Sequence, residues 1–435
     1  MLQKKLSDFP ERLSIVFPIW GLMDMGDGGV YHNFDRMMRE TAERGFNCIR
    51  FEDGAGLIDF SGGRVNGKVP IAEPFPGFSS VIRQSWNFGG DGECDLAARL
   101  AASCRAARKY GIRIVLSSWY YLHTCWYCHD EDRNRYLHSL PPHERYDYFA
   151  HELNSILAML RREGLIDTIA FAEIFNEYDG LSFCTGYGNS NHLSVEERRN
   201  FRADHEAALA WLEKENPDVL FAADSFTPWT DEELFPRNAK IWNFHNYFLW
   251  DIYGEIEGGL IYGNADLTDP TALGETAAFL RKDAPPPERA LKCRAGRFIP
   301  GEMGWLRRVW LYSSLDPASF PEISRRLEKR LFENRNKYLE KIDATIAAVR
   351  EFHRKHCPDA EIVVGEGNTY CGHTGLTWEE RSDLFWEITE HAVKGYRDAG
   401  FRGCVIKTCC GPEDPSWHLC KDRLLGLNRM FRSQE

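Results

Sequence analysis

Two glutamates follow strongly apolar segments, which is where barrel enzymes place catalytic carboxylates. Glu177 closes the stretch Thr168–Gly180, in which Ile169–Phe175 has the apolar pattern of a strand buried on both faces of a parallel sheet. Glu366 comes 189 positions later (366 minus 177), after the apolar run that begins the stretch Glu361–Tyr370. Two carboxylates at strand ends on one barrel mouth are the equipment of a retaining glycosidase, one as acid/base and the other as nucleophile.

The remaining sequence supplies the strands that such a mouth requires. Eight apolar segments are predicted as strands, and an alternation of strand and helix is expected eight times, which is typical of a (β/α)8 TIM barrel rather than a sandwich. The predicted strands are Leu13–Phe17, Asn47–Phe51, Ile112–Ser118, Ile169–Phe175, Asp218–Asp224, Lys240–Tyr247, Glu361–Glu366 and Gly403–Thr408.

Helices are predicted between these strands from their periodicity and their end signals. Ser194 is a plausible N-cap because Glu197 follows three residues later, and Gly45, Gly111 and Gly400 are natural helix stops. The long charged segment 320–356 is expected to be bent or broken. The predicted helices span about 33–44, 95–110, 144–163, 194–215, 320–356, 377–398 and 421–432.

The chain is longer than a bare barrel, because 435 residues exceed the ~250 of a minimal (β/α)8 fold. We expect a single glycosidase barrel over residues 1–435 with long insertions after strands 2, 3, 4 and 6, all on the C-terminal face. Such walls favour a pocket, and hence a short substrate or exo action. The insertions are predicted at about 52–92, 119–141, 180–193 and 248–315.

Composition and charge narrow the class of partner. Aromatic residues make up 13% of the chain, including 13 Trp, which suits either stacking on sugar rings or a large aromatic core. The net charge of −12 comes without a basic block, which argues against nucleic acid and anionic membranes as partners. No apolar run approaches the ~18 residues of a membrane span.

The cysteines and the N-terminus bear on the compartment. Thirteen cysteines form an odd set without disulfide-framework spacing, so reduced thiols are expected. The first 20 residues show no apolar h-region and no small-residue cleavage site, which predicts a cytoplasmic protein. The sequence leaves the oligomeric state open.

The order of these motifs resembles clan A glycoside hydrolases, nearest to the cellulase-like barrels of family 5. That family places an Asn-Glu pair at the end of strand 4, a nucleophilic Glu at the end of strand 7, an Arg on strand 2 and a His-x-Tyr motif on strand 6. The matching residues here are Asn176-Glu177, Glu366, Arg50 and His245-Asn246-Tyr247. The resemblance spans about Leu13–Thr408 and implies a carbohydrate substrate, with no cofactor and no metal.

The resemblance implies a role for each carboxylate. Glu177 is expected to protonate the leaving oxygen and then to act as a base on water, so its pKa must be raised by burial and by the charge of Glu366. Glu366 is expected to attack the anomeric carbon and must stay ionised, which Arg50 and Tyr247 support. Because the clan is retaining, the carboxyl groups should lie about 5–5.5 Å apart.

Three further polar residues complete the predicted site. Asn176 suits a hydrogen bond to a sugar 2-hydroxyl, and His245 is expected to orient the two glutamates or to contact the sugar. Glu173 shares its strand face with Glu177 and is interpreted as a deeper structural partner, with Arg50 as its candidate partner, rather than as a second acid.

The chain also departs from the family pattern. Tyr178 stands where a proline often follows the Asn-Glu pair, and Ser117-Ser118-Trp119 stands where a histidine is usual near strand 3. Strand 8 lacks the usual tryptophan that floors the sugar site. We therefore expect Trp119 and Trp417 to contact the substrate, and other candidates are Trp126, Trp229, Trp305 and Trp310.

Two alternatives remain open at this point. One is a non-catalytic sugar-binding barrel, which would need pocket aromatics but not both glutamates with Arg50. The other is a zinc-dependent barrel hydrolase built on the segment His123–His129, where Cys125 and Cys128 form a Cys-x-x-Cys half-site flanked by histidines. The sugar, the linkage and exo or endo action are not determined by the sequence.

Overall fold

The computed structural model describes most of the barrel and parts of the insertions. The described residues are 5–9, 11–18, 21–23, 31–52, 58, 68–71, 83, 92–118, 135–137, 139–179, 193–229, 231–254, 256–257, 270–284, 303–369 and 372–433. Most of the four predicted insertions therefore lies outside the described residues.

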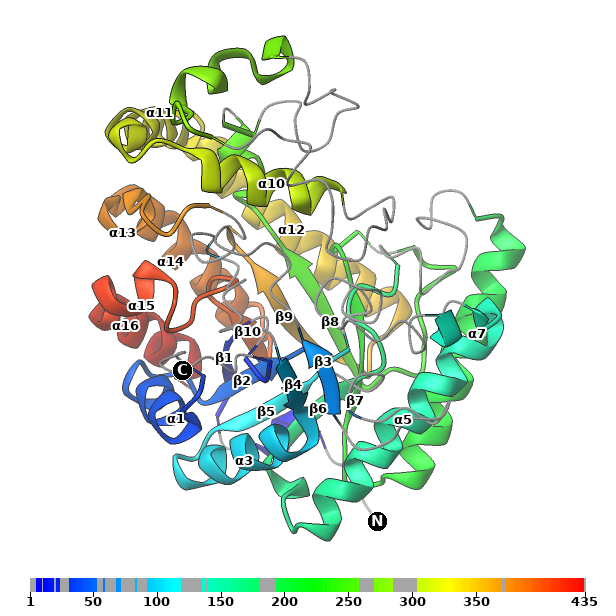
Figure 1. The fold of residues 1–435 in the computed structure, drawn as a ribbon. Coiled ribbons are helices and arrows are strands. Elements are labelled where there is room, and N and C mark those ends of the chain that lie inside the picture. The colour runs from blue at the N-terminus through cyan, green and yellow to red at the C-terminus, as the bar shows by residue number, and fades with distance from the viewer. Residues whose placement is uncertain are drawn as a thin grey trace.

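Eight parallel strands close into a barrel in the order β1-β10-β9-β8-β7-β6-β5-β2 (Figure 1). Nearly every strand residue is buried, because side chains fill the interior and helices cover the outside. This confirms the predicted strands and the (β/α)8 fold. The strands are β1 Leu13–Val16, β2 Cys48–Phe51, β5 Arg113–Leu116, β6 Ile169–Glu173, β7 Phe221–Ser225, β8 Ile241–Asn246, β9 Glu361–Gly367 and β10 Gly403–Val405.

The helices surround this barrel (Figure 1). They are α1 Phe34–Glu43, α3 Leu96–Lys109, α5 Pro142–Arg162, α7 Val195–Glu215, α10 Met303–Ser314, α11 Phe320–Glu333, α12 Arg335–His356, α13 Trp378–Arg381, α14 Asp383–Asp398, α15 Pro415–Leu419 and α16 Lys421–Arg432. Short 3-10 helices lie at η1 Leu6–Asp8, η4 Ile166–Thr168, η6 Trp250–Tyr253, η7 Pro270–Phe279 and η8 Pro317–Ser319.

The predicted helix ends are confirmed where the sequence signals were strongest. The Ser194 side chain accepts a hydrogen bond from the Glu197 backbone N–H, and the Glu197 carboxylate accepts one from the Ser194 backbone N–H, which completes a capping box at the start of α7. The segment 320–356 is broken at Asn334 into α11 and α12. Gly400 follows α14 with φ of 83°, a left-handed conformation that glycine adopts without a steric penalty.

Two features differ from the sequence prediction. No helix separates β7 from β8 among the described residues 226–229 and 231–240, which form turns, so the strand and helix alternation is not complete. The insertion after β2 also contains an antiparallel pair, β3 Lys68–Ile71 with β4 Gly92–Asp95, which was not among the predicted strands. The long sequence separation of the paired segments hid this pairing, because no two-residue hairpin turn joins them.

A buried charged cluster, here called the Arg83 cluster, joins the insertion after β2 to residues near the C-terminus, on α13 and between β10 and α15. Its members are Arg83, Glu379, Glu380, Lys407 and Asp414. Arg83 lies 2.7 Å from Glu380 and 3.2 Å from Asp414, and Lys407 lies 2.9 Å from Glu379. Burial opposes the charge of Glu380, but Arg83 lowers its pKa to about 2. These ion pairs fix Arg83 against α13 and the start of α15.

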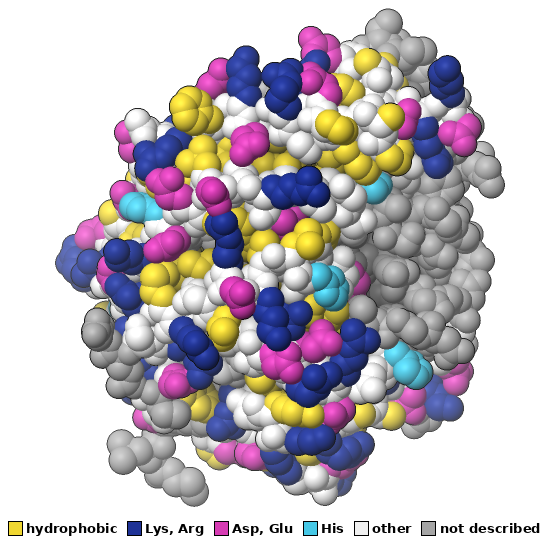
Figure 2. Space-filling model, turned by 90° about the vertical axis from the view of Figure 1, so that its left-hand side faces the viewer, with side chains coloured by type: hydrophobic (Ala, Val, Ile, Leu, Met, Phe, Trp, Pro, Cys, Tyr) yellow, Lys and Arg dark blue, Asp and Glu magenta, His cyan; other side chains and the backbone are white. Residues whose placement is uncertain are grey.

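The surface over α11, α13, α15 and α16, on the left-hand side of Figure 1, carries charges of both signs. Figure 2 shows basic and acidic side chains interspersed on this face rather than gathered into a patch of one sign. Of the helices that the structure describes, none combines the length and the apolar character needed to cross a bilayer.

Candidate active site

Five carboxyl groups and two basic side chains converge at the C-terminal ends of neighbouring strands. The basic residues are Arg50 on β2 and His245 on β8, and all seven side chains are buried. The carboxyl groups belong to Glu52, Glu173, Glu177, Asp224 and Glu366. Parallel strands bring these chain-distant residues together because their carboxyl ends share one mouth.

Arg50 forms ion pairs with several of these carboxyl groups. Its Nη1 lies 3.1 Å from Glu366 Oε1, and its Nη2 donates to Asn176 Oδ1 at 2.6 Å. The same Nη2 lies 2.8–3.1 Å from three further acids, which are Glu52, Glu173 and Asp224. The interpretation of Glu173 as a structural partner of Arg50 is confirmed.

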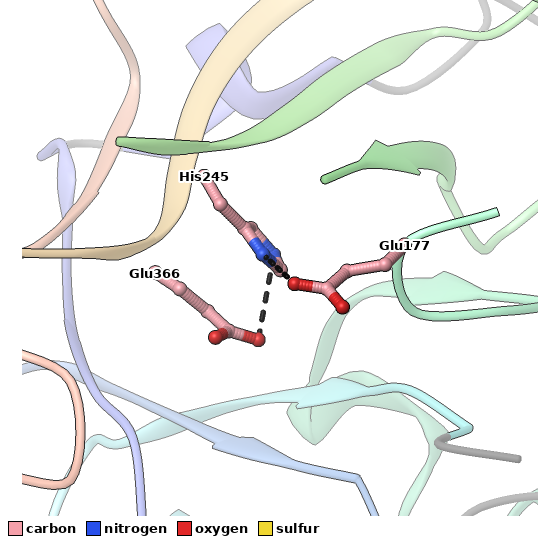
Figure 3. A group of neighbouring side chains, drawn as sticks. All are labelled: Glu177, His245 and Glu366. Atoms are coloured by element: carbon pink, nitrogen blue, oxygen red, sulfur yellow. Dashed lines mark hydrogen bonds and ion pairs between the residues drawn. The ribbon is translucent and has the colours of Figure 1, made fainter. Parts of the chain in front are cut away.

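His245 lies between the two predicted catalytic glutamates (Figure 3). Its Nδ1 is 2.8 Å from Glu177 Oε1, and its Nε2 is 3.4 Å from Glu366 Oε1. One oxygen of each glutamate and a ring nitrogen of His245 all lie within 4.8 Å of one another. The structure therefore brings together the three residues that the sequence pattern placed on β6, β8 and β9.

Both oxygens of Glu366 accept hydrogen bonds. Tyr247 donates its hydroxyl to Oε2, and Arg50 donates to Oε1. Donors on both oxygens stabilise the ionised carboxylate and hold it in one orientation. This is the support for Glu366 that the resemblance implied.

A β-bulge turns Glu366 into the barrel. Asn243 pairs with Val363 and Phe244 with Val364, but His245 pairs with Glu366, so Gly365 is the extra residue. Without the bulge, simple alternation along β9 would point residue 365 inward and residue 366 outward. Only glycine fits here, since a Cβ on Gly365 would lie 2.3 Å from the Asn243 amide oxygen.

The backbone at the mouth is strained at specific points. Glu177 has φ of 53°, and its N–H donates to Asp224 Oδ1 at 2.9 Å. Asn368 and Cys409 also have positive φ, and within the described part of the chain these are the three such residues that are not glycine. All three follow strand ends at the mouth, where strained conformations typically accompany function.

Asp224 holds several of these groups in place. Its carboxylate accepts from Asn243 Nδ2 at 2.6 Å and from Arg50 Nη2 at 2.8 Å, in addition to the Glu177 N–H. His245 Nε2 lies 3.1 Å from its Oδ1. Asp224 therefore fixes the position of the acid, the histidine and the arginine together.

Burial divides the acids into neutral and ionised groups. It raises the pKa of Glu177 to about 7, although the hydrogen bond from His245 opposes this shift, and it raises the pKa of Glu173 to about 8. The pKa of Glu52 is also well above its usual range because of burial. For Asp224, burial is outweighed by His245 and Arg50, which lower its pKa.

The pKa shifts of the two basic groups favour their charged forms. Burial opposes the charge of His245, but Asp224 and Glu366 raise its pKa well above the usual value. Near neutral pH, protonated His245 and Arg50 then face the ionised carboxylate of Asp224, while burial favours the protonated forms of Glu52, Glu173 and Glu177. A carboxyl group with a raised pKa beside a second carboxyl group is the arrangement that acid-assisted nucleophilic attack requires.

The same donors could reach a cation, but they are engaged with one another. Glu177, His245 and Glu366 each offer one ligand atom, and these three atoms lie within 4.8 Å of one another. A divalent cation there would compete with Arg50, whose guanidinium already contacts Glu366 at 3.1 Å. The arrangement therefore suits proton transfer better than metal binding.

The tryptophans that were predicted to contact the sugar differ in their exposure to solvent. Trp417 was expected to contact substrate, and this prediction is wrong: its ring is 0% exposed, stacks on Phe46 and donates to Glu40. Trp310 is also buried in the core, whereas Trp229 is 62% exposed. Trp119, Trp126 and the segment His123–His129 lie outside the described residues, as does the side chain of Trp305.

Sequence reasoning missed several residues of the site. Glu52 and Asp224 could have been recognised, because each is a carboxylate at the end of a predicted strand. Asn243 could not have been recognised as a site residue, because a polar residue within a buried strand often has only a structural role. Ser117, which stands where the family usually has a histidine nearby, donates to Glu173 at 2.8 Å.

Comparison with known proteins places this site in a family context. Residues 18–263 match the family model described as sugar-binding cellulase-like, which includes Arg50, Glu177 and His245 but ends before Glu366. No curated protein matches the chain.

Solved structures share the fold at low identity. A protein of Parabacteroides distasonis described as a candidate glycoside hydrolase is 17% identical with a TM-score of 0.64, over 97% of this chain and 94% of that one. A tri-modular family 5 (subfamily 4) endo-β-1,4-glucanase of Bacillus licheniformis gives 11% and 0.51, over 99% and 62%. A broad-specificity endoglucanase of Clostridium longisporum gives 9% and 0.50, over 98% and 99%. At these identities the likeness shows the fold alone.

Proposed function

The chain belongs to the sugar-binding cellulase-like family, and on that premise we propose that it hydrolyses β-glycosidic bonds with retention of configuration. The observation that carries this proposal is the approach of Glu177 and Glu366 to His245, with one oxygen of each carboxyl group within 4.8 Å of the other. Retaining enzymes hold their carboxyl groups about 5–5.5 Å apart, whereas inverting enzymes need about 6.5–9.5 Å to admit a water molecule.

The proposed reaction has two displacements. In the first, Glu177 gives its proton to the leaving oxygen while Glu366 attacks the anomeric carbon, which forms a glycosyl-Glu366 ester and releases the aglycone. In the second, Glu177 takes a proton from water as that water attacks the same carbon, which releases the sugar and regenerates Glu366. Each step returns Glu177 to the state that the next step needs.

The surrounding residues have supporting roles in this proposal. Arg50 and Tyr247 hold the Glu366 carboxyl group in one orientation, and His245 fixes Glu177 through its Nδ1. Asn176, whose Oδ1 is held by Arg50, is the proposed partner of the sugar 2-hydroxyl. The same proposal includes a short carbohydrate as the substrate and an exo mode of action. It also includes a single domain with four insertions.

Hydrolysis of a panel of aryl β-glycosides tests the proposal. The panel covers the gluco, galacto, manno, xylo and fuco sugars, and proton NMR follows the anomer released first. We expect one sugar to be cleaved with the β anomer appearing before mutarotation. Release of the α anomer first contradicts retention, and no hydrolysis across the panel favours a sugar-binding barrel without catalysis.

The pH dependence of kcat/KM should report the protonation of Glu177. Because the acid must be protonated and its pKa is about 7, we expect kcat/KM to fall as pH rises through about 7. A dinitrophenyl glycoside is the matched control, since its leaving group needs no proton and its kcat/KM should lack this basic limb. The same limb with both substrates would assign it to another group, such as Asp179, whose pKa burial also raises to about 7.

A further inference from the structure

A pocket of about 400 Å³ adjoins the catalytic residues on the β7 and β8 side of the barrel. It shares His245 and Tyr247 with the site described above, and it extends to Lys341 on α12. Its volume falls in the range of small-molecule sites, about 300–1,000 Å³. No role in the proposed double displacement uses this space.

The pocket lies beside the irregular segment that follows β7. A barrel strand is usually followed by a helix, but the described residues 226–229 and 231–240 form turns instead. Phe226 and Trp229, at the start of this segment, form one wall, and α12 forms another.

Aromatic rings line this space in an open arrangement. Trp229 is 62% exposed and Phe226 is 36% exposed, so two of the five large apolar side chains that are exposed in the described chain lie here. Trp250 packs edge-on against Phe226 at 6.4 Å and against Tyr247 at 5.4 Å between ring centroids. An exposed aromatic surface beside a polar centre marks a binding site, and flat rings suit the apolar faces of sugars.

Lys341 brings a positive charge to the pocket. Its Nζ donates one hydrogen bond, to the carbonyl of Phe248 at 3.3 Å, and it makes no ion pair with a described acidic side chain. Of the described residues that line the pocket, none is acidic. Burial and the nearby Lys337 lower the pKa of Lys341, although Asp251 opposes this shift.

The positive charge of Lys341 contrasts with the negative net charge of the chain. The chain carries a net charge of −12, and its other pocket-lining basic residue, His245, is already bound by Glu177 and Asp224. An ammonium group has three protons to donate, and Lys341 uses one of them within the described structure. Lys341 is exposed, so an anionic group of a ligand could accept from its other protons in place of water.

We propose that this pocket is a substrate subsite for a sugar unit bearing a carboxylate, such as a uronic acid, with Trp229 stacking on the ring and Lys341 pairing with the carboxylate. The inference rests on the proposed function, because it assigns the substrate class of the same site. It is a statement about binding, so it can be tested without hydrolysis.

Titration of Trp fluorescence with D-glucuronate and with D-glucose tests the subsite. We expect glucuronate to bind about fivefold more tightly than glucose, which corresponds to one exposed ion pair of about 1 kcal/mol. Lys341→Met should bring glucuronate down to the affinity of glucose without lowering the melting temperature. Trp229→Ala should weaken both sugars.

Lys337→Met is the matched control. Lys337 lies one helical turn before Lys341, pairs with Asp251 at 3.4 Å and does not line the pocket, so its loss should leave both affinities unchanged. Equal affinities for the two sugars in wild type, or no loss in Lys341→Met, overturns recognition of the carboxylate. Absence of binding by both sugars up to about 100 mM overturns the subsite itself.

These outcomes can be separated from those of the glycoside panel. Preferential binding of glucuronate by a protein that hydrolyses nothing would reject the proposed hydrolysis and keep the subsite. Hydrolysis of neutral aryl glycosides without a Lys341-dependent preference for glucuronate would keep the hydrolysis and reject the subsite.

Discussion

Glu366→Ala is expected to lower kcat/KM for the preferred aryl β-glycoside by about 10⁴-fold, because it removes the nucleophile of the first displacement. The change also leaves Tyr247 and Arg50 without the carboxylate that accepts their hydrogen bonds. Steady-state kinetics at neutral pH measures the loss.

Azide makes this experiment specific for the nucleophile. In the space left by Glu366→Ala, azide should attack the anomeric carbon and restore turnover, and the product should be the inverted α-glycosyl azide. Glu361→Gln is a matched control at the opposite end of β9, where Glu361 accepts backbone hydrogen bonds near the N-terminus, and it should retain activity close to wild type. Wild-type activity in Glu366→Ala would sink the mechanism.

Arg50→Met is expected to be the most destabilising single change at the site, at about 3–5 kcal/mol near neutral pH. Arg50 is fully buried and contacts four acids, so its removal leaves buried negative charge without a partner. Urea unfolding followed by far-UV circular dichroism measures the free energy of unfolding. Activity should fall as well, because Glu366 loses one of its donors.

The pH dependence separates charge from packing in this variant. Without Arg50, buried carboxylates bind protons that the unfolded chain does not bind between pH 5 and 7, so the stability deficit should shrink as pH falls from 7 to 5. Arg50→Lys should recover part of the stability, since it keeps the charge but not the forked geometry. An equal deficit at both pH values would instead implicate lost packing, because Arg50 also lies over the Phe17 ring at 5.0 Å.

The strand pattern made most of the barrel predictable. Buried parallel strands are continuously apolar, so the positions of Glu177 and Glu366 at strand ends could be recognised from sequence. The direction of the Glu366 side chain could not, because it depends on the bulge at Gly365. A lone glycine within a strand was the available signal, but it does not reveal which neighbour it makes room for.

Other parts depend on contacts that a one-dimensional pattern does not encode. Asp224 ends a predicted strand, yet its bonds to Arg50, Asn243 and His245 join three strands of the barrel, β2, β7 and β8. Trp417 sits near the C-terminal end of the chain as the family pattern would allow, yet it packs on Phe46. Contacts with residues distant in the sequence therefore determine whether a tryptophan such as Trp417 is exposed to stack on a sugar or buried in the core.

The Arg83 cluster bears on how the insertions of this barrel can be exchanged, in evolution or by engineering. Arg83 belongs to the insertion after β2, while its partners belong to α13, to the residues after β10 and to the cap of α15. A transplanted insertion lacking this arginine would leave three buried acids with Lys407 as their described basic partner. The segment is therefore not a freely interchangeable module. It can be swapped only as a matched set with Glu379, Glu380 and Asp414, which couples the diversification of one wall of the mouth to that of another.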